Sequence, residues 1–291
     1  MRVLVTIPVF NEEAQLAQSI KKLYTYLEAR CAFDFEVTIA DNGSEDRSFA
    51  IANRLSEEYA NLRAAHLGLK GRGRALRQAW GESEADVLSY MDADLSTDLS
   101  AFAPLVQAVA SGDFDLATGS RLLPASLTRR CWRRELISRA YNCLVKRLFR
   151  TRFSDAQCGF KAISRQAASV LLPLIEDTGW FFDTELLIVA EKSGYRIFDL
   201  PVTWTEAADS RVRILSTAWA DCRGLLRLRR DLARGRYANL KRGQAVTSAV
   251  PRPRRERAQT PFERQTGPNP SRLDGPHPSG PTSARNAEER L

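Results

Sequence analysis

Asp92 and Asp94 are the residues whose types and spacing most directly suggest chemistry in this chain. They follow the apolar run 87–91, and because side chains alternate along a strand, both carboxylates leave its end on the same side. Two carboxylates without further protein ligands form an oxygen-only site, which suits Mg²⁺ or Mn²⁺ bound together with water and substrate phosphates. The pattern therefore indicates a metal that holds a nucleotide diphosphate. The alternative is that both are turn residues ahead of a helix beginning near Leu99.

The elements that must position these aspartates repeat one pattern: a short apolar run, a polar loop and an amphipathic stretch at helical spacing. The apolar runs are 3–7, 35–39, 62–67 and 87–91, and the loops after them are 11–12, 41–44, 68–73 and 92–94. The repeat predicts a parallel α/β sheet flanked by helices, in which ligands bind beyond the carboxyl ends of the strands. We therefore expect these loops to line one crevice. In the first unit, Asn11 is the expected N-cap of the helix that follows.

The loop 68–73 is rich in glycine and carries Lys70 and Arg72. Its Gly-x-x-Gly-x-Gly spacing differs from the dinucleotide-binding fingerprint, which follows a first strand, and the chain has no P-loop motif. Cationic side chains among glycines still allow close approach to phosphate oxygens. A solvated turn is the alternative.

Composition narrows the range of partners. With 291 residues and 44% apolar content the chain can bury a sizeable core, and its net charge of +8 favours an anionic partner, either a membrane surface or a nucleic acid. Nucleic-acid binding has no support from an aromatic-basic motif or a recognition fold. The five cysteines are scattered, which favours a reduced, cytoplasmic setting. The only histidines, His66 and His277, argue against imidazole catalysis and histidine metal sites.

The end of the chain differs in composition from the rest. From 244 onward it is rich in Pro, Gly, Ser and Arg with almost no aliphatic residues, so it cannot bury enough apolar surface to offset the entropy of ordering. We expect one domain over residues 1–243 and a disordered basic tail over 244–291. No signal peptide is visible, and no run of about 18 apolar residues could span a bilayer.

Two basic amphipathic stretches suggest contact with a lipid surface. Between 121 and 150, arginines alternate at helical spacing with apolar residues. In the second stretch, the expected apolar stripe consists of Leu215, Ala218, Trp219, Cys222, Leu225 and Leu226. Both stretches could hold a phosphate and a lipid chain, which predicts peripheral attachment to an anionic membrane surface, at the cytoplasmic inner face. Helices packed on the sheet with a solvated basic face are the alternative.

Nine short motifs carry a family resemblance. Those in the first half resemble GT-A, family 2 inverting glycosyltransferases, and they are 7–12 (IPVFNE), 41–44 (DNGS), 71–73 (GRG), 92–94 (DAD) and 119–121 (GSR). Those in the second half are similar to dolichyl-phosphate glucosyltransferases and, more loosely, dolichol-phosphate mannose synthases, and they are 134–139 (RELISR), 155–161 (DAQCGFK), 180–187 (WFFDTELL) and 202–206 (VTWTE). The resemblance runs from about residue 2 to 232 and implies a GT-A, Rossmann-like fold.

The resemblance also implies roles for individual residues. The donor nucleotide sugar would be bound by Pro8, Phe10, Glu12, Asp41, Arg72, Asp92, Ala93, Arg211 and Arg213. Asp92 and Asp94 would bind the metal, and Asp94 and Asp155 would be the catalytic carboxylates. The acceptor phosphate would be held by Arg121, Arg134, Ser138 and Arg139. Two positions depart from the family's pattern: Ser96 stands where mannose synthases usually carry Gln, and Arg72 where the glycine loop usually carries Lys.

A phosphate acceptor would need little help from a base, because its oxygen is already anionic at pH 7. Asp155 is expected to lie nearest this acceptor as an orienting residue or weak base; a turn residue ahead of Phe160 is the alternative. The sequence thus predicts an inverting, metal-dependent glycosyltransferase that moves a hexose from UDP-glucose, or as second choice GDP-mannose, to a polyprenyl phosphate. Alternatives are transfer to a soluble glycan or protein hydroxyl, or a non-catalytic module that binds nucleotide sugars or other anions.

Overall fold

In the computed structural model, the residues described are 1–206 and 214–237. Several expectations fall outside this part of the chain: the tail over 244–291, the donor residues Arg211 and Arg213, and the side chains of Leu215 and Ala218. The domain boundary at 243 and the roles of both arginines therefore stay predictions.

A seven-stranded mixed sheet has the order β3-β2-β1-β4-β7-β5-β8. Its strands are β1 (Arg2–Val9), β2 (Asp34–Asp41), β3 (Leu62–His66), β4 (Val87–Met91), β5 (Leu116–Ser120), β7 (Phe160–Ser164) and β8 (Ile197–Pro201). The first four are mutually parallel, whereas β7 runs antiparallel between β4 and β5. Strands β6 (Leu127–Arg129) and β9 (Thr203–Thr205) pair in a separate sheet. The expected mostly parallel α/β fold is confirmed.

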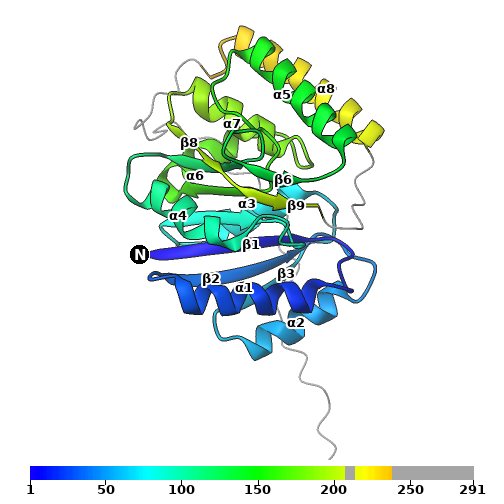
Figure 1. Cartoon of the computed structure of the whole chain (residues 1–291), viewed down its shortest axis with the longest axis vertical. Helices are drawn as coiled ribbons and strands as arrows, with labels where there is room; N and C mark the ends of the chain where they lie inside the picture. The colour runs from blue at the N-terminus through cyan, green and yellow to red at the C-terminus, as the bar shows by residue number, and fades with distance from the viewer. Residues whose placement is uncertain (207–213, 238–291) are drawn as a thin grey trace, which may run out of the picture. The chain divides into compact units, whose positions relative to one another are not determined.

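Helices cover both faces of the large sheet (Figure 1). They are α1 (Leu16–Arg30), α2 (Ser48–Glu58), α3 (Arg72–Glu82), α4 (Phe102–Ala110), α5 (Trp132–Phe149), α6 (Arg165–Leu171), α7 (Phe182–Lys192) and α8 (Ile214–Ala233). Because alternate residues of β1 point to opposite faces, Val3 and Val5 belong to the apolar layer formed with α1, α2 and α4, whereas Leu4 belongs to the layer formed with α3 and α7. These two layers fix the strand ends that carry the polar loops.

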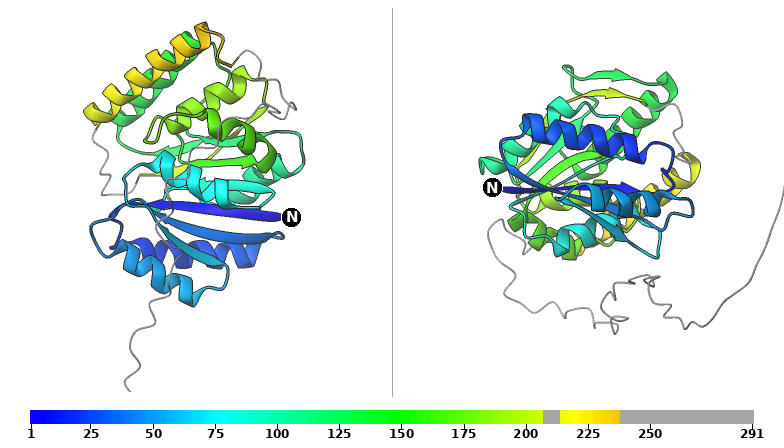
Figure 2. Two further views of the ribbon diagram at one scale, coloured as in Figure 1. Left: turned by 180° about the vertical axis from the view of Figure 1, so that it is seen from behind. Right: turned by 90° about the horizontal axis from the view of Figure 1, so that it is seen from below.

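Helices α5 and α8 lie side by side and contact each other (Figure 2). The outer surface of α5 keeps large apolar side chains in solvent, with Trp132 68% and Leu136 60% exposed. Within the described ranges, no helix is both long and apolar enough to cross a membrane. The exposed apolar side chains of α5 lie among its cations, so this helix presents an amphipathic surface to solvent.

The apolar residues expected to form one stripe along α8 are divided between the core and the solvent. Leu225 is buried, whereas Trp219 and Leu226 are 68% and 63% exposed. Gly224 packs against Phe181, because a Cβ atom at this position would lie 2.4 Å from Cδ1 of that ring. The helix is thus rotated so that its glycine faces the core and two of its largest apolar side chains face outward.

Candidate active site

The polar loops after the first three strands meet through direct hydrogen bonds. The N–H of Gly71 donates to Asn42 Oδ1 at 2.6 Å, and the N–H of Asn11 donates to Ser44 Oγ at 2.9 Å. Asn11 is not the N-cap that the sequence suggested, because it has a φ of 57° and helix α1 begins at Leu16. Its conformation instead serves the contact with the second loop. The expected crevice at the strand ends is thus built by the loops bonding to one another.

Asp41, at the end of β2, is one of the residues predicted to bind the donor nucleotide sugar. Its carboxylate is completely buried and incompletely hydrogen-bonded within the described part of the chain. Its Oδ2 lies 2.6 Å from Nδ1 of His66, a residue for which the sequence indicates neither catalysis nor metal binding. Its Oδ1 has no hydrogen-bond partner among the described residues. A buried acceptor without a donor is costly, so an N–H or O–H group of a bound nucleoside would stabilise this site.

The residues near the end of β1 that are predicted to bind the donor nucleotide sugar lie at the same edge of the sheet as Asp41. The Lys70 ammonium sits 3.6 Å from the centre of the Phe10 ring, a cation–π contact that places positive charge over an aromatic face. Pro8 is half-buried in β1, and Glu12 accepts a hydrogen bond of 2.6 Å from the Gln15 amide. The edge therefore combines an aromatic ring, a cation and a carboxylate.

Arg72 is the cation at the centre of the crevice. Only 7% of it is exposed, and one terminal nitrogen lies 2.8 Å from Asp92 Oδ1 without the alignment of a hydrogen bond. Its guanidinium also lies over the rings of Tyr90, at 5.0 Å, and Trp180, at 4.8 Å. A guanidinium stacked on aromatic faces is held in place while its N–H groups remain available for phosphate oxygens.

Asp92 is packed tightly against the chain that follows Asp155. Its N–H donates to the carbonyl of Gly159 at 3.2 Å, and a Cβ atom at position 159 would lie 1.9 Å from its Oδ2. Burial raises the pKa of Asp92, the nearby Asp94 and Asp183 charges raise it further, and Arg72 only partly offsets them. The carboxylate is therefore short of positive charge. Ala93, also a predicted donor residue, is buried beside it.

Asp94 is oriented by Ser96, the residue that departs from the family pattern. Its Oδ1 accepts from the Ser96 N–H at 3.0 Å and its Oδ2 from the Ser96 hydroxyl at 2.6 Å. The described ranges contain no group of three or more His, Cys, Asp or Glu that could hold a metal. Two carboxylates that repel each other still fit a divalent cation that takes its other ligands from phosphates and water. The donor set is thus compatible with Mg²⁺ or Mn²⁺.

Asp183, at the start of α7, is a site residue to which the sequence analysis gave no role. It is buried, lies 3.1 Å from the Lys161 ammonium and 3.9 Å from Arg72 Nε, and accepts a hydrogen bond from the Tyr90 hydroxyl. Its motif was recognised at 180–187, but no periodicity in the sequence places the start of this helix against the end of β4. Only the packing of α7 on the sheet does so.

Asp155 and Arg121 form a closed ion pair. The guanidinium donates to both carboxylate oxygens, at 2.7 and 3.0 Å, and the Arg121 N–H donates to Oδ2 at 3.2 Å. Burial alone would raise the pKa of Asp155, but Arg121 outweighs it and lowers the pKa to about 2. Such a carboxylate is a poor proton acceptor near neutral pH. The geometry therefore argues against the weak-base role and favours the orienting one.

The remaining predicted acceptor residues lie on α5, and their cations are also paired. Arg134 forms an ion pair with Glu206, and Arg139 bonds to Glu135 at 2.5 Å. The Ser138 hydroxyl is buried and lacks a hydrogen-bond partner in the described ranges. No contact between described residues joins Arg121 directly to Arg134. The structure thus places the α5 residues on one helix but does not show them converging with Arg121 on one point.

The fold is that of a mostly parallel α/β protein, with the paired carboxylates Asp92 and Asp94 at the carboxyl end of β4. The family model of glycosyl transferase family 2 matches residues 4–172, and the chain belongs to this family. The solved structure of glucosyl-3-phosphoglycerate synthase from Mycobacterium tuberculosis, in complex with Mn²⁺, UDP and glucosyl-3-phosphoglycerate, is similar with a TM-score of 0.58. It is 20% identical, with 78% of each chain covered, so it supports the GT-A-like fold alone.

Two kinds of relative are similar in sequence. Glycosyltransferase AglD of Haloferax volcanii is 39% identical over 74% of this chain, which spans only 35% of that protein. The dolichyl-phosphate β-glucosyltransferases of mouse and human are 30% and 31% identical over 72% of this chain and 68% of their own lengths. The resemblance to family 2 enzymes of this kind is therefore confirmed.

Proposed function

We propose that this chain transfers a hexose from a nucleotide sugar to a polyprenyl phosphate, with inversion and with a divalent metal. The observation that carries the proposal is the placement of Asp92 and Asp94 directly after β4, with the buried Arg72 guanidinium 2.8 Å from Asp92 Oδ1. The similarity to dolichyl-phosphate β-glucosyltransferases supports glucose as the sugar and a lipid phosphate as the acceptor. UDP-glucose is the preferred donor and GDP-mannose the second.

On the donor side, Asp41 and the Phe10 ring would hold the nucleoside, with Pro8 and Glu12 at the same edge. Arg72 would lie beside the diphosphate, where a planar guanidinium can donate to two oxygens at once. Mg²⁺ or Mn²⁺ would be held by Asp92 and Asp94 and would supply positive charge that stabilises the leaving diphosphate. Arg211 and Arg213 would add charge around the leaving group.

In the reaction, an acceptor phosphate oxygen attacks the anomeric carbon from the face opposite the diphosphate. The new carbon–oxygen bond forms as the bond to the diphosphate breaks, and the nucleoside diphosphate leaves with the electron pair. The nucleophile carries its own charge at pH 7, so no residue has to remove a proton. Asp155 then acts as a positioning residue, because it holds the Arg121 guanidinium in place.

The acceptor phosphate would be bound by Arg121, Arg134, Ser138 and Arg139. Because the guanidiniums are paired with carboxylates, phosphate binding requires them to share or exchange those partners, which makes acceptor binding weaker but more selective for a dianion. Ser138, whose hydroxyl has no hydrogen-bond partner among the described residues, can donate without any exchange.

The chain would bind its polyprenyl phosphate acceptor at a membrane surface. Trp132 and Leu136 on α5 and Trp219 and Leu226 on α8 are exposed, and arginines lie among them. Aromatic and aliphatic side chains mixed with cations are typical of helices that lie in the interface of an anionic membrane. We propose peripheral attachment at the cytoplasmic inner face, with no nucleic-acid partner.

The test is direct transfer. The purified chain is incubated with labelled UDP-glucose or GDP-mannose, Mg²⁺ and a short polyprenyl phosphate, and organic-extractable label is measured. We expect label from one donor, and none when EDTA is present. Label that stays in the aqueous phase on a glycan or protein would favour the alternative acceptor, and no label from any donor would refute the transfer itself.

A further inference from the structure

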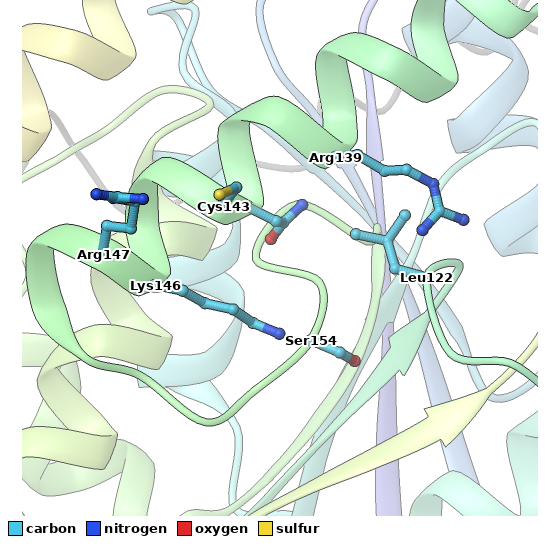
Figure 3. Close-up of a pocket in the computed structure, with 7 residues that line it drawn as sticks. Leu122, Arg139, Cys143, Lys146, Arg147 and Ser154 are labelled. Carbon is cyan, nitrogen blue, oxygen red and sulfur yellow. The ribbon is translucent and has the colours of Figure 1, made fainter.

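A groove of about 420 Å³ lies along the second half of α5. Helix α5 contributes Arg139, Cys143, Lys146 and Arg147, and the groove is closed by Leu122 and Ser154 (Figure 3). In this view the Lys146 side chain extends toward Ser154 and the Arg139 side chain toward Leu122. None of the residues given a role in the transfer lines it, except Arg139 at its rim.

The charged side chains that line the groove are all positive. Three cations line it and no carboxylate does. The side chains of Lys146 and Arg147 make no hydrogen bond or ion pair with any described residue, and Arg139 uses only Nε for Glu135. Lys146 and Arg147 are also in the last turn of α5, where cations favour the helix dipole. That effect explains a preference for cations there, and the Asp199 carboxylate, which accepts a hydrogen bond from the Ser154 N–H, interacts with the charge of Lys146. Neither explains why three cations and no carboxylate line the groove itself.

The groove also offers apolar surface. Leu122, Cys143 and the methylene stems of Lys146 and Arg147 line it. On the same helix, Leu136 and Leu144 are 60% and 41% exposed, so the groove opens from a helix that carries apolar side chains in solvent. A ligand that matches both features has an anionic head and a hydrocarbon tail.

We propose that this groove binds the phosphate headgroup of an anionic membrane lipid, at a site separate from the acceptor phosphate. Charge complementarity and continuity with the exposed apolar surface of α5 select this occupant. The groove differs from the acceptor residues because Arg121 and Arg134 form ion pairs with Asp155 and Glu206, whereas Lys146 and Arg147 form none with any described residue. The inference rests on the membrane association proposed above, but not on the transfer reaction.

The first experiment compares vesicle binding by the full chain and two variants of equal charge. Lys146→Gln/Arg147→Gln removes two cations from the groove, and Arg229→Gln/Arg230→Gln removes two exposed cations from α8. Phosphatidylcholine vesicles with or without phosphatidylglycerol are sedimented with each protein. We expect the groove variant to lose on the order of tenfold more affinity for the anionic vesicles than the α8 variant does, because a fixed site adds to diffuse attraction. Equal losses would mean a diffuse charged surface and would overturn the proposal.

The second experiment uses the chain's own thiols as reporters. Cys143 lies in the groove and Cys222 lies on α8, and both are exposed. Maleimide labelling of each is followed with short-chain phosphatidic acid, short-chain phosphatidylcholine or inorganic phosphate. We expect phosphatidic acid alone to slow labelling at Cys143 several-fold while Cys222 is unaffected. Equal protection of both thiols, or equal protection of Cys143 by inorganic phosphate, would contradict a lipid headgroup site.

A third measurement separates this site from the acceptor site. In detergent with a short polyprenyl phosphate, the groove variant should transfer the hexose within about threefold of the unmodified chain, because Lys146 and Arg147 are not among the residues proposed to bind either substrate. Protection of Cys143 by polyprenyl phosphate but not by phosphatidic acid, together with lost transfer, would assign the groove to the acceptor and refute a separate site. Failure of transfer in the unmodified chain would count against the proposed function and leave the vesicle result to be judged alone.

Discussion

Two Arg–Asp pairs in this chain each contain a largely buried guanidinium, but they differ in how completely the two residues are paired. Arg121 donates to both oxygens of Asp155, at 2.7 and 3.0 Å, and its own N–H adds another bond. Arg72 reaches Asp92 through one nitrogen at 2.8 Å and is shared with Asp183. The pKa of Asp155 is lowered to about 2, whereas the pKa of Asp92 is raised.

The difference in pairing indicates a structural role for Asp155 and a ligand-binding role for Asp92. A carboxylate whose oxygens both accept hydrogen bonds and whose pKa is lowered gains little from a further ligand. We therefore expect Asp155 to stabilise the fold around Arg121. A carboxylate with a raised pKa next to another carboxylate gains most when a cation arrives. Asp155 is completely buried, while 38% of the Asp92 side chain is exposed and can be reached by a ligand.

The largest effect is expected where the comparison predicts an incomplete site. Asp94→Ala should lower transfer by about 1000-fold or more, because it removes half of the protein's carboxylate ligands for the metal, while the melting temperature stays near that of the unmodified chain. The matched control is Asp98→Ala, an exposed carboxylate in the same loop that caps a short helical turn through Ser100. The control should lose little activity; full activity of Asp94→Ala, or activity in EDTA, would remove the metal from the mechanism.

The closed pair predicts the opposite outcome, a loss of stability. Asp155→Asn should lower the free energy of unfolding by about 3–4 kcal/mol, because it leaves the Arg121 guanidinium buried without a counter-charge. Since the folded pKa of Asp155 lies below its unfolded value, its contribution is complete above about pH 4 and is lost as the pH falls toward 2. Urea unfolding measures it, with the exposed Asp113→Asn as control. Unchanged stability with lost activity would contradict the structural contribution of the pair and leave Asp155 a role in the reaction alone.

The Arg134–Glu206 ion pair is intermediate between these two pairs, and it is more exposed to solvent than the Arg121–Asp155 pair. The side chains of Arg134 and Glu206 are 34% and 18% exposed, so this pair can open to admit a phosphate. Losing one guanidinium from a partly buried phosphate costs about 2–3 kcal/mol, so Arg134→Ala should reduce transfer roughly 30- to 150-fold. Donor affinity, measured by calorimetry, should stay within a few-fold.

The matched control for this pair is its carboxylate. Glu206→Gln frees Arg134 and should leave acceptor KM unchanged or lower it. A parallel collapse of donor binding in Arg134→Ala would place Arg134 in the diphosphate site or in the fold, and acceptor KM rising equally in both variants would mean that the ion pair itself is structural.

The sequence predicted the parts of this site that depend on local pattern. Asp92 and Asp94 were found because a strand's alternation and its carboxyl end are visible in the sequence, and the sheet itself followed from the repeated apolar runs. Pairing partners distant in the chain were not found: nothing local indicates that Asp183 lies beside Arg72, or that Glu206 neutralises Arg134. Such contacts depend on how α7 and the β9 region pack.

Helix α8 shows what an apolar pattern leaves open. Its apolar residues fit a helical stripe, which suits either a helix packed on the core or one that lies on a membrane surface. Gly224 faces the core, because Phe181 fills the space that a Cβ atom at this position would need. The exposed Trp219 and Leu226 are what remains of that stripe. A pattern therefore predicts an amphipathic helix better than it predicts which side faces inward.

The smallest expected effect concerns a buried carboxylate that forms no ion pair with a guanidinium of the described residues. Asp221 is 4% exposed, its Oδ2 accepts from the Gln157 amide at 2.7 Å, and its Oδ1 has no partner within the described part of the chain. Burial, with the charges of Asp177 and Asp183, outweighs that hydrogen bond and raises the pKa to about 6. Because the folded pKa exceeds the unfolded one, the charged form costs stability above about pH 6, and the cost disappears as the pH falls toward 4.

Asp221→Asn keeps an oxygen that can accept from Gln157 and removes the charge. It should therefore raise the free energy of unfolding by about 1–2 kcal/mol at pH 7.5, and the gain should shrink steadily toward pH 4, where the carboxyl of the unmodified chain is neutral. Thermal unfolding of both proteins at several pH values measures this. A variant less stable than the unmodified chain at pH 7.5 would show that Asp221 has a cationic partner, and the contrast with Asp155 would then be one of degree rather than of kind.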